Sequence, residues 1–264
     1  MDTYTHGHAE PVLQSHRWRT AENSASYLLP SLRPGLDLLD VGCGPGTITV
    51  DLAARVAPGR VLGLDLSPDP LDEARTAAAR AGVEVGFRVG DVYALDLPDG
   101  SFDVVHAHQV LQHLTDPVAA LREMARVCRP GGVLAVRDVD YAATTWFPPD
   151  RGLDRWLELY GQVARRNDAE PDAGRRLLAW AHAAGLRDVT ATTSSWCFAT
   201  PAERQWWGNS WAGRATSSSF AEQAVAYGLA TPAELEEVAG AWRRWRDADD
   251  GWLGMLHGEL LIRL

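Results

Sequence analysis

Apolar residues in the first 140 positions fall into short runs that alternate with longer amphipathic stretches. Five short runs, bounded by glycine, proline or aspartate, are typical of buried strands: residues 36–41, 60–65, 83–89, 103–107 and 133–139. Three stretches between them repeat apolar side chains every three or four positions, as helices do: residues 47–57, 67–82 and 117–128. Repeated strand–helix units of this kind predict an α/β fold, with a parallel sheet covered by helices on both faces.

The second part of the chain has a different pattern and carries most of the eleven tryptophans. Its periodicity predicts helices over 151–166 and 172–184, a strand over 189–198 and a last strand over 252–264. The sequence TPAE occurs at 200–203 and again at 231–234, and each copy predicts a helix start with a capping box and proline at the first helical position. No low-complexity linker separates the two parts, so we expect the second to extend the sheet of the first.

Composition narrows the classes of function. All 25 basic residues are arginine, which excludes Schiff-base chemistry on lysine and the P-loop lysine. A net charge of −10 argues against general phosphate attraction, so we expect no nucleic-acid partner. Because no apolar run approaches the roughly 18 residues of a membrane span, and no signal peptide is visible, we expect a cytoplasmic protein without a membrane partner. Three widely spaced cysteines are typical of reduced thiols.

The most informative segment is a glycine-rich turn between the first strand and the first helix. It reads DVGCGPG over residues 40–46, with Gly42, Gly44 and Gly46 in the pattern GxGxG and Asp40 two positions before the first glycine. Glycines allow close approach of a ligand to the backbone, and the helix start offers free N–H groups. The dinucleotide fingerprint GxGxxG has its third glycine one position later, so this spacing disfavours a nicotinamide dehydrogenase. We therefore expect a ligand with an amine or a cationic group, with Asp40 facing it.

Two further carboxylates follow strands where such a ligand needs them. Asp65 ends the second predicted strand, and a carboxylate there can hold both hydroxyls of a ribose. Asp91 follows the third strand and can accept a hydrogen bond from an adenine amino group. Both residues would instead be ordinary polar strand ends if no nucleoside bound here.

A set of collinear motifs now resembles a known family: LDVGCGPG (39–46), GLDLS (63–67), GDV (90–92), FDVV (102–105) and LREMARVCRPGG (121–132). Together they look like the class I S-adenosylmethionine (SAM) methyltransferases, and most like the ubiquinone/menaquinone-biosynthesis-like (methyltransferase type 11-like) small-molecule branch. The resemblance covers about residues 20–140. It implies a Rossmann-like seven-stranded sheet in the order 3-2-1-4-5-7-6 with the last strand antiparallel, and it supports strands six and seven at about 187–198 and 253–263.

The resemblance also implies roles for individual residues. Asp40, Gly42, Gly44 and Gly46 would line the methionine end of SAM, while Asp65 with Leu66 would hold the ribose and Asp91 with Val92 the adenine. His108 and Gln109, after the fourth strand, would be further SAM contacts. The expected organisation is a single structural domain with three parts: an N-terminal lid over 1–35, a SAM-binding core over 36–140, and a C-terminal completion with a helical, Trp-rich cap over 141–264.

Methyl transfer depends mainly on aligning donor and acceptor, and a general base helps only when the acceptor atom carries a proton. The candidate bases are His108, His113 and Asp140, with His257 and Asp138 as further possibilities that the sequence does not rank. His106 and His108 share one strand face, but without a third ligand we expect no metal.

An aromatic acceptor pocket is the last expectation. Tyr141 and Trp146 follow the fifth strand, Trp207 and Trp211 share a helix, and His257 lies on the last strand. They would form a pocket under a lid, or simply the buried stripe of a cap helix. Tyr4, His6, Trp18 and Arg19 could close over the ligands or pack on the sheet. We expect a monomer or homodimer that methylates a small organic molecule; the alternatives are other SAM chemistry on the same fold, or a non-catalytic SAM-binding protein.

Overall fold

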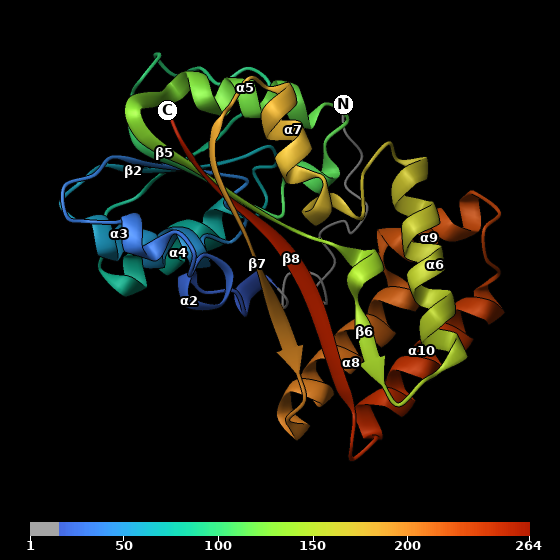
Figure 1. Cartoon of the computed structure of the whole chain (residues 1–264). Helices are drawn as coiled ribbons and strands as arrows, with labels where there is room; N and C mark the ends of the chain where they lie inside the picture. The colour runs from blue at the N-terminus through green and yellow to red at the C-terminus, as the bar shows by residue number, and fades with distance from the viewer. Residues whose placement is uncertain (1–15) are drawn as a thin grey trace.

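The computed structural model describes residues 16–264 of the chain. A central eight-stranded sheet, seen in Figure 1, has the order β3-β2-β1-β4-β5-β8-β6, with β7 paired to the other side of β8. The strands are β1 (Leu38–Val41), β2 (Val61–Asp65), β3 (Gly86–Val89), β4 (Phe102–His108), β5 (Cys128–Val139), β6 (Thr145–Phe147), β7 (Asp188–Phe198) and β8 (Trp252–Arg263). The helices are α2 (Ala21–Ser24), α3 (Thr47–Val56), α4 (Leu71–Ala81), α5 (Pro117–Val127), α6 (Arg151–Arg166), α7 (Leu177–Ala183), α8 (Pro201–Ser217), α9 (Ser219–Ala226) and α10 (Pro232–Asp247).

The topology confirms the expected methyltransferase sheet and adds one strand to it. β1 to β5 are parallel, β8 runs antiparallel to β5, and β7 pairs with β8 along its whole length. The additional strand is β6, which pairs with β8 over residues 252–254, beyond the stretch of β8 that β5 covers. β5 pairs only with residues 257–263 of β8. The beginning of β8 therefore remains available on that side for pairing with β6.

Most predicted elements are confirmed, but several boundaries differ. The helix expected over 172–184 is a 3₁₀ turn, Ala173–Arg175, followed by α7, and the strand expected over 83–89 begins at Gly86. The helix expected from Ser67 begins at Leu71 instead, because the backbone N–H of Ser67 bonds to Asp65 within the turn that follows β2. Likewise β5 begins at Cys128, so Pro130 and Gly131 lie inside this strand and do not separate it from α5. Both predicted capping boxes are present, at the starts of α8 and α10.

Helices cover both faces of the sheet, and a group of four forms the cap. In Figure 1, α2, α3 and α4 lie on one side of the sheet and α5 with α7 on the other, while α6, α8, α9 and α10 gather at the end where β6 lies. The cap has its own apolar core, in which the rings of Trp156, Trp211 and Trp242 pack edge to face or stacked, with centroids 4.7–5.8 Å apart. Large aromatic side chains are stabilised by such mutual burial.

Candidate active site

A cavity of about 440 Å³ opens at the carboxyl ends of β1, β2, β3 and β4. That is where open α/β sheets bind ligands, and the volume lies in the range of small-molecule sites. Its walls come from the glycine-rich turn, the ends of the next three strands, the 3₁₀ turn after β4 and the N-terminal segment: residues 41–45, 47, 48, 64–68, 70, 90–92, 95, 108–110, 113, 114, 16 and 19. Every lining residue among those described precedes residue 115.

At Gly42 and Gly44 the glycine-rich turn presents only backbone to the cavity. Gly42, Gly44 and Gly46 all have positive φ, at 69°, 53° and 78°, which glycine adopts without strain. A Cβ on Gly44 would meet no other atom closer than His16 Nδ1 at 4.0 Å, so this position faces open space. A Cβ on Gly46 would lie 2.7 Å from that of Ala74. Gly42 and Gly44 therefore line the cavity, whereas Gly46 allows α3 and α4 to pack closely.

Asp40 does not reach the cavity, in contrast to the expectation that it faces a ligand. Its side chain is 3% exposed and accepts hydrogen bonds from Thr49 Oγ1 and from His106 Nδ1, the latter at 2.7 Å. These contacts tie β1 to α3 and β4 beneath the turn. The residue therefore supports the loop from behind, because the strand directs its side chain to the covered face of the sheet.

Asp65 and Asp91 do line the cavity, on neighbouring strand ends, together with Leu66 and Val92. One carboxylate oxygen of Asp65 accepts the N–H of Gly44 at 2.9 Å and the other accepts that of Ser67 at 3.0 Å. Asp65 thus holds the glycine turn against the end of β2. Asp91 accepts the N–H of Tyr93 at 2.9 Å through one of its two carboxylate oxygens.

His108, the last residue of β4, also lines the cavity and is 5% exposed. Among the described residues neither of its ring nitrogens has a hydrogen-bond partner. Burial and then the nearby charges of Arg19 and Arg137 hold its pKa well below the usual value, so the imidazole is neutral. A neutral imidazole of this kind is able to accept a hydrogen bond from a bound molecule at one ring nitrogen and donate one from the other.

Gln109 follows His108 in a left-handed conformation, with φ of 55°, and is held at both ends of its side chain. Its amide nitrogen donates to His257 Nε2 at 3.0 Å, and its carbonyl oxygen accepts from Arg19 Nη2 at 3.0 Å. His257 in turn donates from Nδ1 to the carbonyl of Met255. Through Gln109, His257 of β8 thereby helps to position Arg19 at the cavity wall.

The N-terminal segment is part of the cavity wall, which the sequence indicated only as one alternative for Arg19 and not at all for His16. Arg17 makes a two-point ion pair with Glu73 on α4, and the N–H of Ala21 bonds to Asp51 on α3. The Thr47 hydroxyl donates to the carbonyl of His16. Trp18 packs against aromatic residues of β7 and α8, with centroids 5.3–5.4 Å from the rings of Trp196, Phe198 and Trp206. Tyr4 and His6 lie outside the described residues.

Two of the three candidate bases line the cavity and the third does not. His113 is on the wall, and burial lowers its pKa to about 3. Asp140 is 2% exposed and lies elsewhere: its two oxygens accept two hydrogen bonds from the guanidinium of Arg175, both at 2.6 Å. Its carboxylate also caps the short turn Tyr141–Ala143, so the prediction of a base at Asp140 is wrong: the group is already used in holding β5 to the following segment.

The predicted aromatic acceptor pocket is also corrected. None of its five residues lines the cavity: Tyr141, Trp146, Trp207 and Trp211 belong to or pack on the cap core, and His257 is fully buried beside Gln109. Trp207 stacks on Phe198 at 4.4 Å and Trp211 is 0% exposed. Four amphipathic helices need a shared core of their own, and these side chains provide it. The alternative interpretation, a buried stripe of a cap helix, is the one that the structure supports.

Neither a membrane helix nor a metal cluster occurs in the part of the chain that the structure describes. No helix within residues 16–264 is long and apolar enough to cross a bilayer. Within the same residues, no three histidine, cysteine, aspartate or glutamate side chains gather as metal ligands do.

Comparisons with known proteins agree with this fold. Residues 39–136 match the family model described as a methyltransferase domain. An uncharacterised methyltransferase of Schizosaccharomyces pombe is 33% identical over 269 residues, covering 98% of this chain and 96% of that protein. A probable methyltransferase of Aspergillus luteorubrus is 30% identical over 98% of this chain and 96% of its own length.

Among solved structures, the YcgJ protein of Bacillus subtilis superimposes with a TM-score of 0.60 at 18% identity, covering 92% of this chain and 98% of that one. At that identity the likeness concerns the fold. The relatives that align along the whole chain, together with the matching domain and the methyltransferase sheet, establish the family. This chain belongs to the class I SAM-dependent methyltransferases.

Proposed function

We propose that the protein transfers the methyl group of SAM to a small organic acceptor whose reacting atom carries a proton. The observation that carries this proposal is His108: a neutral, buried imidazole on the wall of the family's cofactor cavity, with both nitrogens unpartnered among residues 16–264. Buried polar groups normally have partners, so such a group favours a bound molecule beside it. We further propose that the protein is cytoplasmic and does not act on nucleic acid.

The cavity residues fit SAM in their chemistry. Backbone groups of residues 42–45 offer close approach to the methionine end, and the guanidinium of Arg19 is a charge partner for its carboxylate. Asp65 and Leu66 would hold the ribose, and Asp91 with Val92 the adenine. SAM supplies an already activated methyl group on a sulfonium. The division into a lid over 1–35, a core over 36–140 and a completed sheet with cap over 141–264 remains part of the proposal.

The contribution of the protein's own residues is alignment and proton removal. His108 would accept a hydrogen bond from the acceptor's reacting group and take its proton only as the methyl group is transferred, because its lowered pKa disfavours the charged imidazolium before that step. Gln109, fixed between Arg19 and His257, would hold the wall beside it. Asp138 is a poorer base because it is fully buried and does not line the cavity.

Two measurements test the proposal. Calorimetry should show micromolar binding of SAM and S-adenosylhomocysteine, the demethylated product, with no binding of NAD. A panel of hydroxyl, amine and thiol acceptors is then screened for S-adenosylhomocysteine release. With an acceptor found, His108→Gln should lower kcat about 10²- to 10⁴-fold and leave S-adenosylhomocysteine affinity within a few fold. Unchanged kcat in this variant would remove His108 as the base, and tight NAD binding without SAM binding would contradict the whole proposal.

A further inference from the structure

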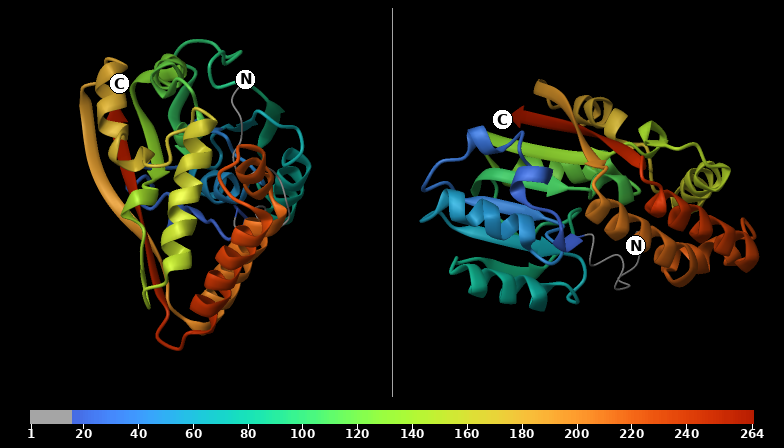
Figure 2. Two further views of the ribbon diagram at one scale, coloured as in Figure 1. Left: turned by 90° about the vertical axis from the view of Figure 1, so that its right-hand side faces the viewer. Right: turned by 90° about the horizontal axis from the view of Figure 1, so that it is seen from below.

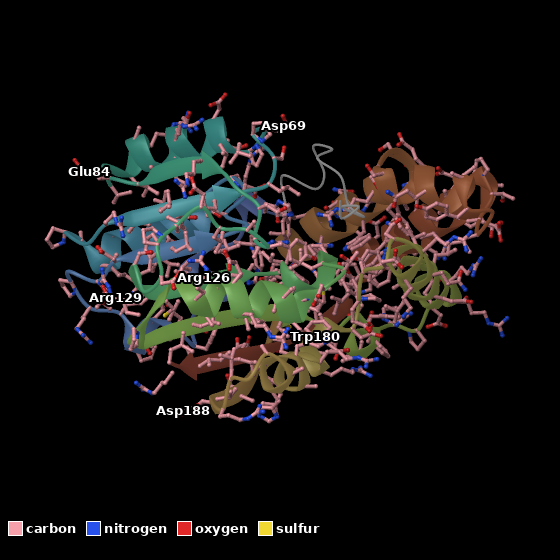
Figure 3. The ribbon with its side chains drawn as sticks, turned by 90° about the horizontal axis from the view of Figure 1, so that it is seen from above. Asp69, Glu84, Arg126, Arg129, Trp180 and Asp188 are labelled. Atoms are coloured by element: carbon pink, nitrogen blue, oxygen red, sulfur yellow. The ribbon has the colours of Figure 1, made fainter. Side chains whose placement is uncertain are left out.

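Strand β7 is a long edge of the sheet that no other strand covers. It pairs with β8 in an unbroken register over its eleven residues, Asp188 to Phe198. Within the described chain, residues 190–198 make no backbone hydrogen bonds other than those to β8. Figure 2 shows β7 at the outer margin of the molecule beside β8, and Figure 3 shows Asp188 at the same margin. Among residues 16–264, no segment therefore pairs with the outward N–H and C=O groups of this strand.

The other free edges of the sheet are protected, whereas β7 is not. Natural proteins prevent edge-to-edge pairing with short strands, charges, proline or bulges. β3 has four residues and carries Arg88, and β6 has three residues and is followed by Pro148. Residues 189–198 contain no charge and no proline, and the register has no bulge. Thr190, Thr192 and Thr193 are exposed β-branched residues, which favour strand pairing.

We propose that β7 pairs antiparallel with β7 of a second copy of this chain, so that the two sheets become one continuous sheet. Antiparallel pairing of a strand with itself obeys a two-fold axis and closes at two chains, as most homo-oligomers do. With a net charge of −10, two copies repel one another over most of their surface. Electrostatic repulsion between two copies is weakest at the uncharged β7 edge. There the N–H and C=O groups of each copy are able to form hydrogen bonds with those of the other.

The register follows from symmetry. A two-fold axis perpendicular to the sheet leaves the two faces of the sheet in place. Side chains on one face of β7 therefore pair with side chains on the same face of the second β7, which are the odd-numbered residues on one face and the even-numbered residues on the other. Thr193 is the middle residue of the eleven-residue strand and would lie opposite Thr193 of the second copy, with Ala191 opposite Ser195. All three side chains are exposed in the single chain, and threonine pairs are favourable cross-strand neighbours.

Sedimentation velocity over 1–200 µM tests this pairing on the full chain. We expect a concentration-dependent change from 28.8 kDa to twice that mass. Thr193→Lys places two like charges directly across the axis and should weaken the dimer at least tenfold. Thr145→Lys is the matched control, because Thr145 is also an exposed strand threonine but lies on β6. It should leave the dimer unchanged.

Thermal melting and S-adenosylhomocysteine binding show that both variants are folded. Hydrogen exchange provides a second measurement that needs no variant: amides of residues 190–197 should become more protected as protein concentration rises. A monomer at every concentration would overturn the proposal. So would a dimer that Thr193→Lys does not weaken and whose formation leaves the β7 amides equally exposed.

Discussion

The carboxylate of Asp65 is the group whose removal we expect to weaken cofactor binding most clearly. It lines the cavity and also accepts the N–H groups of Gly44 and Ser67, at 2.9 and 3.0 Å. Asp65→Asn keeps the size of the side chain but replaces one acceptor oxygen with a donor. One of the two backbone N–H groups then faces another N–H, and the charge that would bind the ribose hydroxyls is gone.

The magnitude follows from these contacts. Loss of a charge-assisted hydrogen bond costs about 1.5–3 kcal/mol, which lowers affinity about 10- to 150-fold. The unpaired N–H lies beside the open cavity, where water is able to replace its partner, so we expect the free energy of unfolding to fall by only about 1 kcal/mol. Asp65→Ala should bind the cofactor as weakly as the Asn variant.

Isothermal calorimetry with S-adenosylhomocysteine measures the affinity, and urea unfolding measures the stability. Asp69→Asn is a matched control: it removes the same charge four residues along the chain, at an exposed position (Figure 3) outside the cavity wall. The control should bind normally. If Asp65→Asn binds S-adenosylhomocysteine within twofold of the parent, Asp65 only braces the turn and the ribose assignment is refuted.

Four further substitutions test the cavity wall, the packing of α3 on α4, the cap core and the buried carboxyl group of Asp138. Gly44→Ala places a methyl group towards the cavity and should reduce S-adenosylhomocysteine affinity in calorimetry. Gly46→Ala brings a Cβ to 2.7 Å from that of Ala74 at a positive φ, and should instead lower the free energy of unfolding by about 2–4 kcal/mol. Trp211→Ala, in the cap core, should cost about 3–5 kcal/mol in urea unfolding and leave S-adenosylhomocysteine affinity unchanged. Burial raises the pKa of Asp138 to about 7, so between pH 4 and 7 the folded protein keeps a proton that the unfolded chain releases. Stability therefore falls as pH rises through this window, by about 3 kcal/mol from pH 5 to 8, and Asp138→Asn should remove that part of the slope in urea titrations at each pH.

Local patterns were sufficient to predict the order of β1 to β5 with their helices and several residues of the cavity wall, but not β6 or α9. Short apolar runs and helical periodicity identify β1 to β5 and α6, because burial selects residues at spacings of two and 3.6. Resemblance to the family supplied the strand order, which the structure confirms apart from the additional strand β6. Gly42, Gly44, Asp65 and Asp91 were predictable because each lies within a few residues of a strand end, and parallel strands bring those ends to one edge.

Tertiary packing alone decided the rest of the site. Asp40 and Asp140 carry the same carboxylate as Asp65, yet His106 and Arg175, distant in sequence, bind them on covered faces. No periodicity marks His16, which reaches the cavity because distant residues of α3 and α4 anchor its segment. Trp211 is a residue type that is suitable for an aromatic pocket. Whether it faces a ligand or a neighbouring helix depends on how the cap helices pack, and here they enclose it. Spacing along the chain determines which face a side chain occupies, and only the folded arrangement determines what covers that face.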